Sequence, residues 1–253
     1  MSSTKPTIVF APGAWHLPSC FDLVKEQLEP LGYPVVGITY PSVGAEPPNK
    51  NATDDALVLK GTLKELTDLG TEIVVISHSY GGLVASNALE GFGAKQRAAD
   101  GKKGGVIVNI YVTSFVIPKG NNLVDLLPNG EYLEWMRREG DYVYVNNPAD
   151  IFYHDLTPEA QQQAISQLKH QSAGVYDSRA TYEPWHDIPS AYLATDADRA
   201  IVPPAQAGMI SILGDSALVE HVNTSHSPFL SQPRAVTDFI VKAAKFDAEQ
   251  SKA

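Results

Sequence analysis

Short, almost continuous apolar runs rich in β-branched residues recur along the chain and constrain its fold more than any other feature. They are TIVFAPG, PVVGITYP, EIVVISHS, GGVIVNIYVTSFVIP, SAYLATD and ALVEHVN, each closed by turn residues. Strands that are buried on both faces have this composition. Segments with helical spacing alternate with them, at 20–31, 54–69, 80–90, 204–213 and 232–246. The alternation predicts an α/β fold with a mostly parallel, doubly wound sheet of about six core strands.

Residues 118–189 interrupt this alternation. They hold two amphipathic segments, EYLEWMRREG and TPEAQQQAISQLKHQS, with the short β-like run DYVYVN between them. The region is too long for one crossover between strands and lacks a further core strand. We therefore expect one domain over 1–253, with 118–189 inserted as a cap above the carboxyl edge of the sheet. GAKQRAADGKKGG is expected to be a polar surface loop, and KFDAEQSKA a solvated tail.

The net charge of the chain restricts the kinds of molecule that it is expected to bind. The chain has 29 acidic and 19 basic side chains and a formal net charge of -10. Such a surface repels nucleic acid and anionic membranes, so we expect neither as a partner. A small neutral or weakly polar molecule fits better, and a homodimer is left open.

The cellular location is inferred from what the ends and the cysteine content of the chain are typical of. The N-terminal run MSSTKPTIVFAPGAW is cut off by Pro12 and Gly13, which indicates a strand entering a turn and not a signal peptide. No apolar run has the length of a membrane span. Cys20 is the only cysteine, which is more typical of a buried structural thiol than of a nucleophile. We expect a cytoplasmic protein.

The stretch VVISHSYGGLVA, residues 74–85, joins a predicted strand to a predicted helix through a tight turn. It differs from the nucleophile-elbow pattern G-x-S-x-G because Ser77 stands at the first glycine. An elbow strains its central residue and requires small residues two positions before and after it, which Ser77 and Gly81 supply. We predict that Ser79 is the nucleophile and that Ser77 packs under the turn. The alternative is a serine that only caps the following helix.

A serine nucleophile needs a base that is itself oriented by an acid. In a doubly wound sheet these groups lie on loops after later strands. The segment SAYLATDADRAIVPP offers Asp196 and Asp198, and ALVEHVNTSHSPFLSQP offers His221 and His226. We prefer His226 because it follows the predicted strand, whereas His221 lies inside it. The order Ser, Asp, His is that of α/β-hydrolases, and at this point both aspartates remain candidates.

Four segments together resemble the α/β-hydrolase superfamily: FAPGAWHLPSCFDLV, SHSYGG, YLATDADRAIVPPAQ and SHSPFLSQP. The resemblance covers nearly the whole chain and is strongest to the branch of plant methyl esterases and hydroxynitrile lyases, with related microbial and fungal hydrolases. It implies the α/β-hydrolase fold, and its T-D-x-D pattern implies Asp198 as the acid. It also implies an oxyanion hole formed by the backbone N–H groups of Ala14 and Tyr80. Pro12 replaces the first histidine of the family's H-G-A-x-H segment, which leaves the backbone donor of Ala14 in place.

One difference from the family pattern bears on the choice between lyase and esterase activity. The lyases of this branch carry a lysine directly after the catalytic histidine, whereas this chain has Ser227. The resemblance therefore implies a serine esterase or lactonase that cleaves a small, largely apolar substrate through an acyl-enzyme, without a metal or other cofactor. The alternatives are a non-hydrolytic lyase, a cyclase or a receptor on the same fold, and a purely structural protein.

Aromatic and histidine side chains near these segments are expected to contact the substrate. The predicted contacts are Trp15, His16, His78, Trp135, Tyr142 and Trp185. Aromatic residues of a cap commonly form only its core, which is the alternative for the last three. The histidines in the cap region show no metal-ligand spacing such as H-E-x-x-H.

Overall fold

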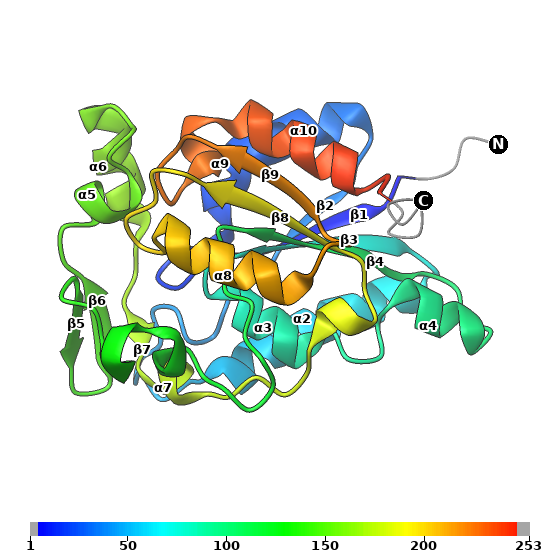
Figure 1. Cartoon of the computed structure of the whole chain (residues 1–253), viewed down its shortest axis with the longest axis horizontal. Coiled ribbons are helices and arrows are strands. Elements are labelled where there is room, and N and C mark those ends of the chain that lie inside the picture. Colours follow the sequence, from blue (N-terminus) through cyan, green and yellow to red (C-terminus); the bar gives the residue numbers. More distant parts are fainter. Residues whose placement is uncertain (1–4, 247–253) are drawn as a thin grey trace.

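The computed structural model describes residues 5–246 and contains a parallel sheet of six strands in the order β2-β1-β3-β4-β8-β9 (Figure 1). The strands are β1 (Thr7–Ala11), β2 (Val35–Gly37), β3 (Glu72–His78), β4 (Gly105–Val112), β8 (Ser190–Thr195) and β9 (Leu218–Val222). Every pairing between neighbouring strands is parallel. The predicted fold class is confirmed.

Alternate residues of the central strands face opposite sides, so the sheet has a hydrophobic core on each face. On one face, Val9 and Val75 pack with Leu63 of helix α2 (Ala52–Asp68). On the other face, Ile8 packs with Phe239 of helix α10 (Pro233–Ala243). Figure 1 shows α2 and α3 (Gly81–Ala88) on one side of the sheet and α10 on the other. This two-sided burial explains why the strands are continuous apolar runs and do not alternate with polar residues.

The helices around the main sheet follow the predicted spacing, with two additions, α4 (Ala94–Ala99) and α9 (Pro228–Ser231). They are α1 (Asp22–Leu28), α2 (Ala52–Asp68), α3 (Gly81–Ala88), α4 (Ala94–Ala99), α8 (Pro203–Leu213), α9 (Pro228–Ser231) and α10 (Pro233–Ala243), with short 3-10 turns η1 (Pro18–Phe21) and η2 (Glu29–Leu31) beside α1. Helix α4 lies within GAKQRAADGKKGG, so the prediction of a loop there was wrong in its first half. Alanine, lysine, glutamine and arginine are strong helix formers, and six of them in a row suffice for a short helix.

Residues 118–189, called the cap region below, form a second small sheet with short helices. The elements are η3 (Val124–Leu126), η4 (Pro128–Gly130), β5 (Met136–Glu139), β6 (Tyr142–Val145), α5 (Pro148–Phe152), α6 (Pro158–Gln167), β7 (Gln171–Ser172), α7 (Gly174–Asp177) and η5 (Pro184–His186). The order β5-β6-β7 is antiparallel. Figure 1 shows α5, α6 and this sheet gathered together at one end of the main sheet. That the region acts as a cap stays a prediction.

The segment EYLEWMRREG differs from its amphipathic interpretation, because its second half is strand β5. Gly140 has a φ of 62°, and Glu139 pairs with Tyr142 across it. A two-residue turn with a left-handed glycine favours a hairpin over a helix. The local turn therefore overrides the helical spacing of the apolar residues.

Two further predictions concern the C-terminal tail and membrane-spanning segments. The predicted solvated tail, 245–253, lies mostly outside the described residues. Across residues 5–246, no helix combines the length and the apolar character needed to cross a bilayer.

Candidate active site

Ser79 occupies the sharp turn between β3, which ends at His78, and α3, which begins at Gly81. Its φ of 51° lies in the left-handed region, which is costly for a residue other than glycine. The Ser79 carbonyl accepts hydrogen bonds from Ser114 Oγ at 2.9 Å and from Phe115 N at 3.1 Å. A Cβ atom at Gly81 would clash with the carbonyl oxygen of Ala11. The strained turn is thus held from several sides and requires a glycine after it.

The two serines of the turn have different surroundings. Ser77 is fully buried at the end of β3, and its Oγ donates to Asn109 Oδ1 of β4 at 2.9 Å. Ser79 is 8% exposed and lines a cavity. The Ser77 hydroxyl is therefore engaged beneath the turn, and Ser79 is the serine that faces open space.

His226 and Asp198 form a buried pair beside the elbow. The Nδ1 atom of His226 donates to Asp198 Oδ2 at 2.8 Å, and the two residues are 2% and 3% exposed. Because a carboxylate only accepts, this bond places the imidazole proton on Nδ1 and leaves Nε2 as an acceptor. His226 and Ser79 line the same cavity.

Several donors surround the carboxylate of Asp198. Oδ1 accepts from the backbone N–H groups of Ala200 at 2.7 Å and Ile201 at 2.9 Å, and Oδ2 also accepts from the hydroxyl groups of Thr113 and Thr195. Burial on its own would raise the pKa of Asp198, but the charge and hydrogen bond of His226 and the bonds from Thr113 and Ile201 outweigh it. The pKa of this carboxyl is consequently lowered below its usual value. Asp198 is thus an ionised acceptor.

The competing residues of the sequence form a pair of their own. His221 Nδ1 lies 2.9 Å from Asp196 Oδ1, and the two side chains are 58% and 49% exposed. Neither is among the described residues that line the cavity at Ser79. The structure therefore separates a buried pair at the elbow from an exposed pair away from it.

The cavity at Ser79, called the elbow cavity, has an apolar wall and a volume of about 40 Å³. Its lining comprises Ala14, Trp15, Ser79, Tyr80, Phe115, Leu123, Leu127, Leu133, Trp135, Met136, Phe152, Tyr176, Ala200, Ile201 and His226. None of these side chains is an acid, a lysine or an arginine. The cavity has room for only a few water molecules. An ester larger than this would bind only if cap side chains moved.

Ala14 and Tyr80, the predicted oxyanion donors, both line the elbow cavity. Within residues 5–246, the backbone N–H of neither residue donates to another protein group. The turn that carries Ala14 is strained, because the next residue, Trp15, has a φ of 65°. Tyr80 directly precedes α3, whose N-terminus favours negative charge. Both N–H groups thus have no protein acceptor in this part of the chain.

The structure brings two of the six predicted substrate contacts to the elbow cavity. Trp15 and Trp135 line it, with their rings 5.8 Å apart in an edge-to-face arrangement. Tyr142 instead lies on the cap sheet, where its hydroxyl donates to Glu46 Oε2 at 2.8 Å. Trp185 packs against the cluster that contains Tyr111. For these two the aromatic side chain serves packing at a distance from the elbow.

The two predicted histidine contacts also lie outside the lining of the elbow cavity. His78 is fully buried, and its Nε2–H donates to the backbone carbonyl of His226 at 3.0 Å. His16 Nδ1–H donates to the Ala14 carbonyl at 2.7 Å, and its Nε2 accepts from Tyr153 Oη at 2.8 Å. Burial lowers the pKa of His16 to about 4 and that of His78 well below the usual value. Both are neutral groups that support the backbone of the site.

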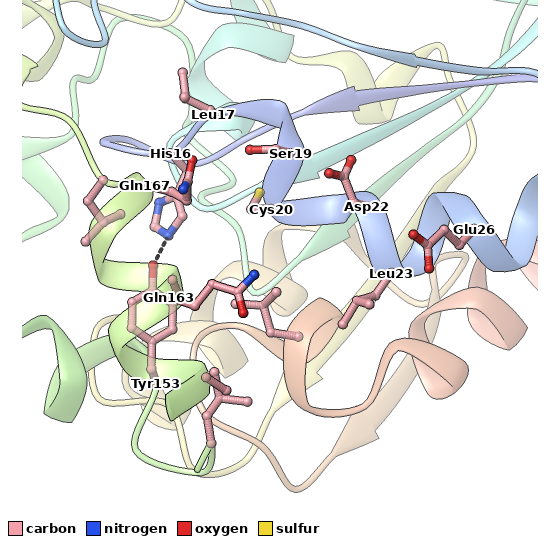
Figure 2. Close-up of a pocket in the computed structure, with 15 residues that line it drawn as sticks. His16, Leu17, Ser19, Cys20, Asp22, Leu23, Glu26, Tyr153, Gln163 and Gln167 are labelled. Atoms are coloured by element: carbon pink, nitrogen blue, oxygen red, sulfur yellow. Dashed lines mark hydrogen bonds between the residues drawn. The ribbon is translucent and has the colours of Figure 1, made fainter. Parts of the chain in front are cut away.

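His16 and Tyr153 line a larger hollow of about 380 Å³ (Figure 2). Figure 2 shows the hydrogen bond between these two side chains, with the Cys20 thiol to one side of His16. The hollow extends between α1 and α6 and includes none of Ser79, His226 and Asp198. Burial raises the pKa of the Cys20 thiol well above its usual value, which favours the protonated thiol.

Some polar residues of the site were not found from the sequence. Thr113 directly follows β4 and Thr195 ends β8, and both hydroxyls donate to Asp198. A polar residue that closes an apolar strand next to a candidate acid is the only signal that could have suggested them. As for metal sites, the described part of the chain holds no cluster of three or more His, Cys, Asp or Glu side chains that could bind an ion.

Comparison with known proteins agrees with this architecture. Residues 8–239 match the Alpha/beta hydrolase family. Alpha/beta hydrolase nvfD of Aspergillus novofumigatus is 28% identical over 244 residues, which cover 95% of this chain and 97% of that protein. Methylesterase 2 of Arabidopsis thaliana is 22% identical over 268 residues, which cover 95% of this chain and 96% of that protein.

The fold is shared with solved structures as well. The crystal structure of a pyrethroid hydrolase from Sphingobium faniae JZ-2 superposes with a TM-score of 0.78 at 20% identity, covering 97% of this chain and 100% of that one. The predicted resemblance, which included plant methyl esterases and fungal hydrolases, is thereby confirmed. The chain belongs to the alpha/beta hydrolase family.

Proposed function

We propose that this protein is a serine esterase or lactonase that cleaves a carboxylic ester of a small, largely apolar molecule. The observation that carries the proposal is that Ser79 and His226 line one apolar cavity while the buried Asp198 holds His226 at 2.8 Å. A nucleophile, a base and an acid that orients the base are the parts that acyl transfer needs.

The reaction begins when the Ser79 hydroxyl attacks the carbonyl carbon of the substrate. The Nε2 atom of His226 takes the hydroxyl proton, and Asp198 keeps the imidazole in the tautomer that has Nε2 free. The imidazolium then protonates the leaving alkoxide, and an ester between Ser79 and the acyl group remains. Water, deprotonated by the same histidine, releases the acid and restores Ser79.

The N–H groups of Ala14 and Tyr80 are proposed to bind the oxyanion that forms in both half-reactions. Both residues line the cavity, and both N–H groups are free of other protein acceptors within residues 5–246. A preorganised donor of this kind is worth about 3 kcal/mol at the transition state. This assignment also explains why Ser79 and Trp15 both retain strained backbone angles.

The substrate class follows from the wall of the elbow cavity. Leucine, phenylalanine, tryptophan and methionine side chains make up most of it, without an acidic or basic side chain to bind a charged group. The names of similar proteins, a methylesterase and a pyrethroid hydrolase, support a hydrolase, and the first supports an esterase.

A panel of p-nitrophenyl esters, aryl methyl esters and lactones tests the proposal. We expect turnover of short-chain neutral esters that is lost in Ser79→Ala and retained in Ser77→Ala. The second variant removes the neighbouring hydroxyl, which donates to Asn109 beneath the turn. Cyanide release from mandelonitrile without ester turnover would favour the lyase alternative, and an inert protein would contradict the proposal.

A further inference from the structure

Asp55 is a buried carboxylate that the proposed mechanism does not use. It lies in the first turn of α2 and has no exposed surface. Its carboxylate accepts three hydrogen bonds, from Ser42 N at 3.0 Å, from Ser42 Oγ at 2.5 Å and from Tyr80 Oη at 2.5 Å. One of its donors is thus the residue that directly follows Ser79.

The hydrogen bonds continue from Asp55 into the cap region. Gln171 Nε2 of β7 donates to Ser42 Oγ at 2.6 Å, and Gln171 Oε1 accepts from the backbone N–H of Trp15 at 3.0 Å. Each donor in this series points toward the carboxylate. The series of hydrogen bonds therefore runs in one direction, from Trp15 through Gln171 and Ser42 to Asp55. Ser42 and Gln171 are also fully buried.

The two ends of this network coincide with the two halves of the proposed oxyanion hole. Tyr80 itself carries one of the N–H donors. Trp15 shares a peptide bond with Ala14, which carries the other. Trp15 is held at two further points, because its indole N–H donates to the Val143 carbonyl at 2.9 Å and its own carbonyl accepts from Lys169 N at 3.0 Å. The position of Ala14 is consequently set by the cap region as well as by β1.

A buried carboxylate contributes little net stability to a fold, because removing its charge from water costs free energy. Burial raises the pKa of Asp55 even though Ser42 and Tyr80 donate to it, so the site penalises the charged form. An apolar side chain of similar size commonly stabilises a core as well or better. The Asp55 carboxylate lies between the segments that carry Ala14 and Tyr80, and this position indicates a role other than stability.

We propose that Asp55 is a positioning residue that fixes the N–H groups of Tyr80 and Ala14 relative to each other, through Tyr80 directly and through Ser42 and Gln171 to Trp15. The inference rests on the proposed esterase function. An oxyanion donor acts only when it lies within about 3 Å of the developing charge, and a displacement near 1 Å costs about a hundredfold in rate. The network would therefore act on the rate of the chemical step and not on substrate binding.

The sharpest variant is Tyr80→Phe, because it removes only the phenol oxygen and keeps the backbone donor. We expect kcat on a p-nitrophenyl ester to fall by about tenfold, with KM within twofold of wild type. Rates are expressed per active site titrated with a fluorophosphonate, so that unfolded protein does not count. Tyr40→Phe is the matched control. The Tyr40 ring packs edge-on against Tyr80 at 5.5 Å, and its hydroxyl has no hydrogen-bond partner among residues 5–246.

Gln171→Leu tests the other arm of the network, and the double variant tests whether the two arms work together. If both act through Asp55, the double variant loses less than the product of the two single losses. The affinity of a trifluoromethyl ketone, which forms an oxyanion on Ser79, should fall by the same factor as kcat/KM. The affinity of the product acid, which forms none, should stay within twofold.

The outcomes separate this inference from the function on which it rests. A wild-type protein that neither turns over esters nor reacts with the fluorophosphonate overturns both. Wild-type turnover together with a Tyr80→Phe rate per titrated site equal to that of Tyr40→Phe overturns the positioning role alone. Asp55→Asn is made as a supporting variant, and its effect on kcat should equal or exceed that of Tyr80→Phe in whatever fraction folds.

Discussion

Nδ1 of His226 donates to Asp198 Oδ2 at 2.8 Å. His221 and Asp196, which lie close to these two residues in sequence, instead pair with each other at the surface. His226 of the buried pair lines the elbow cavity, and neither residue of the exposed pair does. The environment thus distinguishes two His–Asp pairs that have the same chemistry. Only the buried pair includes a residue that shares a cavity with Ser79.

Asp198→Asn should reduce kcat by up to about ten-thousandfold, because an asparagine in this place can hold the imidazole in the wrong tautomer. The measurement is kcat on a p-nitrophenyl ester, with the far-ultraviolet circular dichroism unchanged. Asp196→Asn is the matched control and should change kcat by less than about threefold. A larger loss in the control would mean that the acid is misassigned.

Ser77→Gly should keep activity within a few-fold, since glycine satisfies the same size limit under the turn. We expect a loss of about 1 to 2 kcal/mol in the free energy of unfolding, from added backbone freedom and the lost bond to Asn109. Ser77→Leu should lose activity, because a bulky side chain in this fully buried place displaces Ser79. Urea denaturation and ester turnover measure both effects. An active Ser77→Leu protein would show that the turn tolerates more volume than the structure allows.

Stability should decrease as the pH falls from about 6.5 to about 4, in part because of His16. Its pKa is lowered by burial to about 4, so below pH 6.5 the unfolded chain binds a proton that the folded chain refuses. The stability associated with the neutral imidazole is present above the unfolded pKa and is lost as the pH falls toward the folded one, by about 3 kcal/mol in all.

His16→Asn should flatten this pH dependence, because asparagine can donate to the Ala14 carbonyl without titrating. The free energy of unfolding at pH 7 and pH 4.5 provides the test. His186→Asn removes an imidazole that is 66% exposed and controls for the change in net charge. An unchanged slope in His16→Asn would contradict the neutral, buried state of this histidine.

Met136→Ala should widen the acyl specificity. Met136 is 7% exposed on β5 and lines the elbow cavity, whose volume is about 40 Å³. We expect kcat/KM for hexanoate relative to acetate esters to rise severalfold, because the truncated side chain leaves space. Met209→Ala, on α8 and outside the cavity lining, should leave the ratio unchanged. Equal effects of the two variants would show that this wall does not face the acyl chain.

The sequence predicted those features that depend on local patterns. Continuous apolar runs identified the strands because the sheet is covered on both faces, and the strand-turn-helix around Ser79 followed from the small residues that flank it. The contacts made across the fold could not be predicted in this way. Nothing near Tyr142 or Trp185 shows that their neighbours are Glu46 and a packing cluster. The network of Asp55 joins loop, elbow and cap segments that lie far apart in the sequence.

The identity of the nucleophile is the central claim, and the site of covalent labelling tests it most directly. The wild-type protein and the variants Ser79→Ala and Ser77→Ala are treated with a fluorophosphonate, digested and mapped by tandem mass spectrometry. We predict one adduct per chain, on Ser79 in the wild type and in Ser77→Ala, and none in Ser79→Ala, which should also lack ester turnover. An adduct on Ser77 or on any other residue, or turnover that survives in Ser79→Ala, would contradict the account.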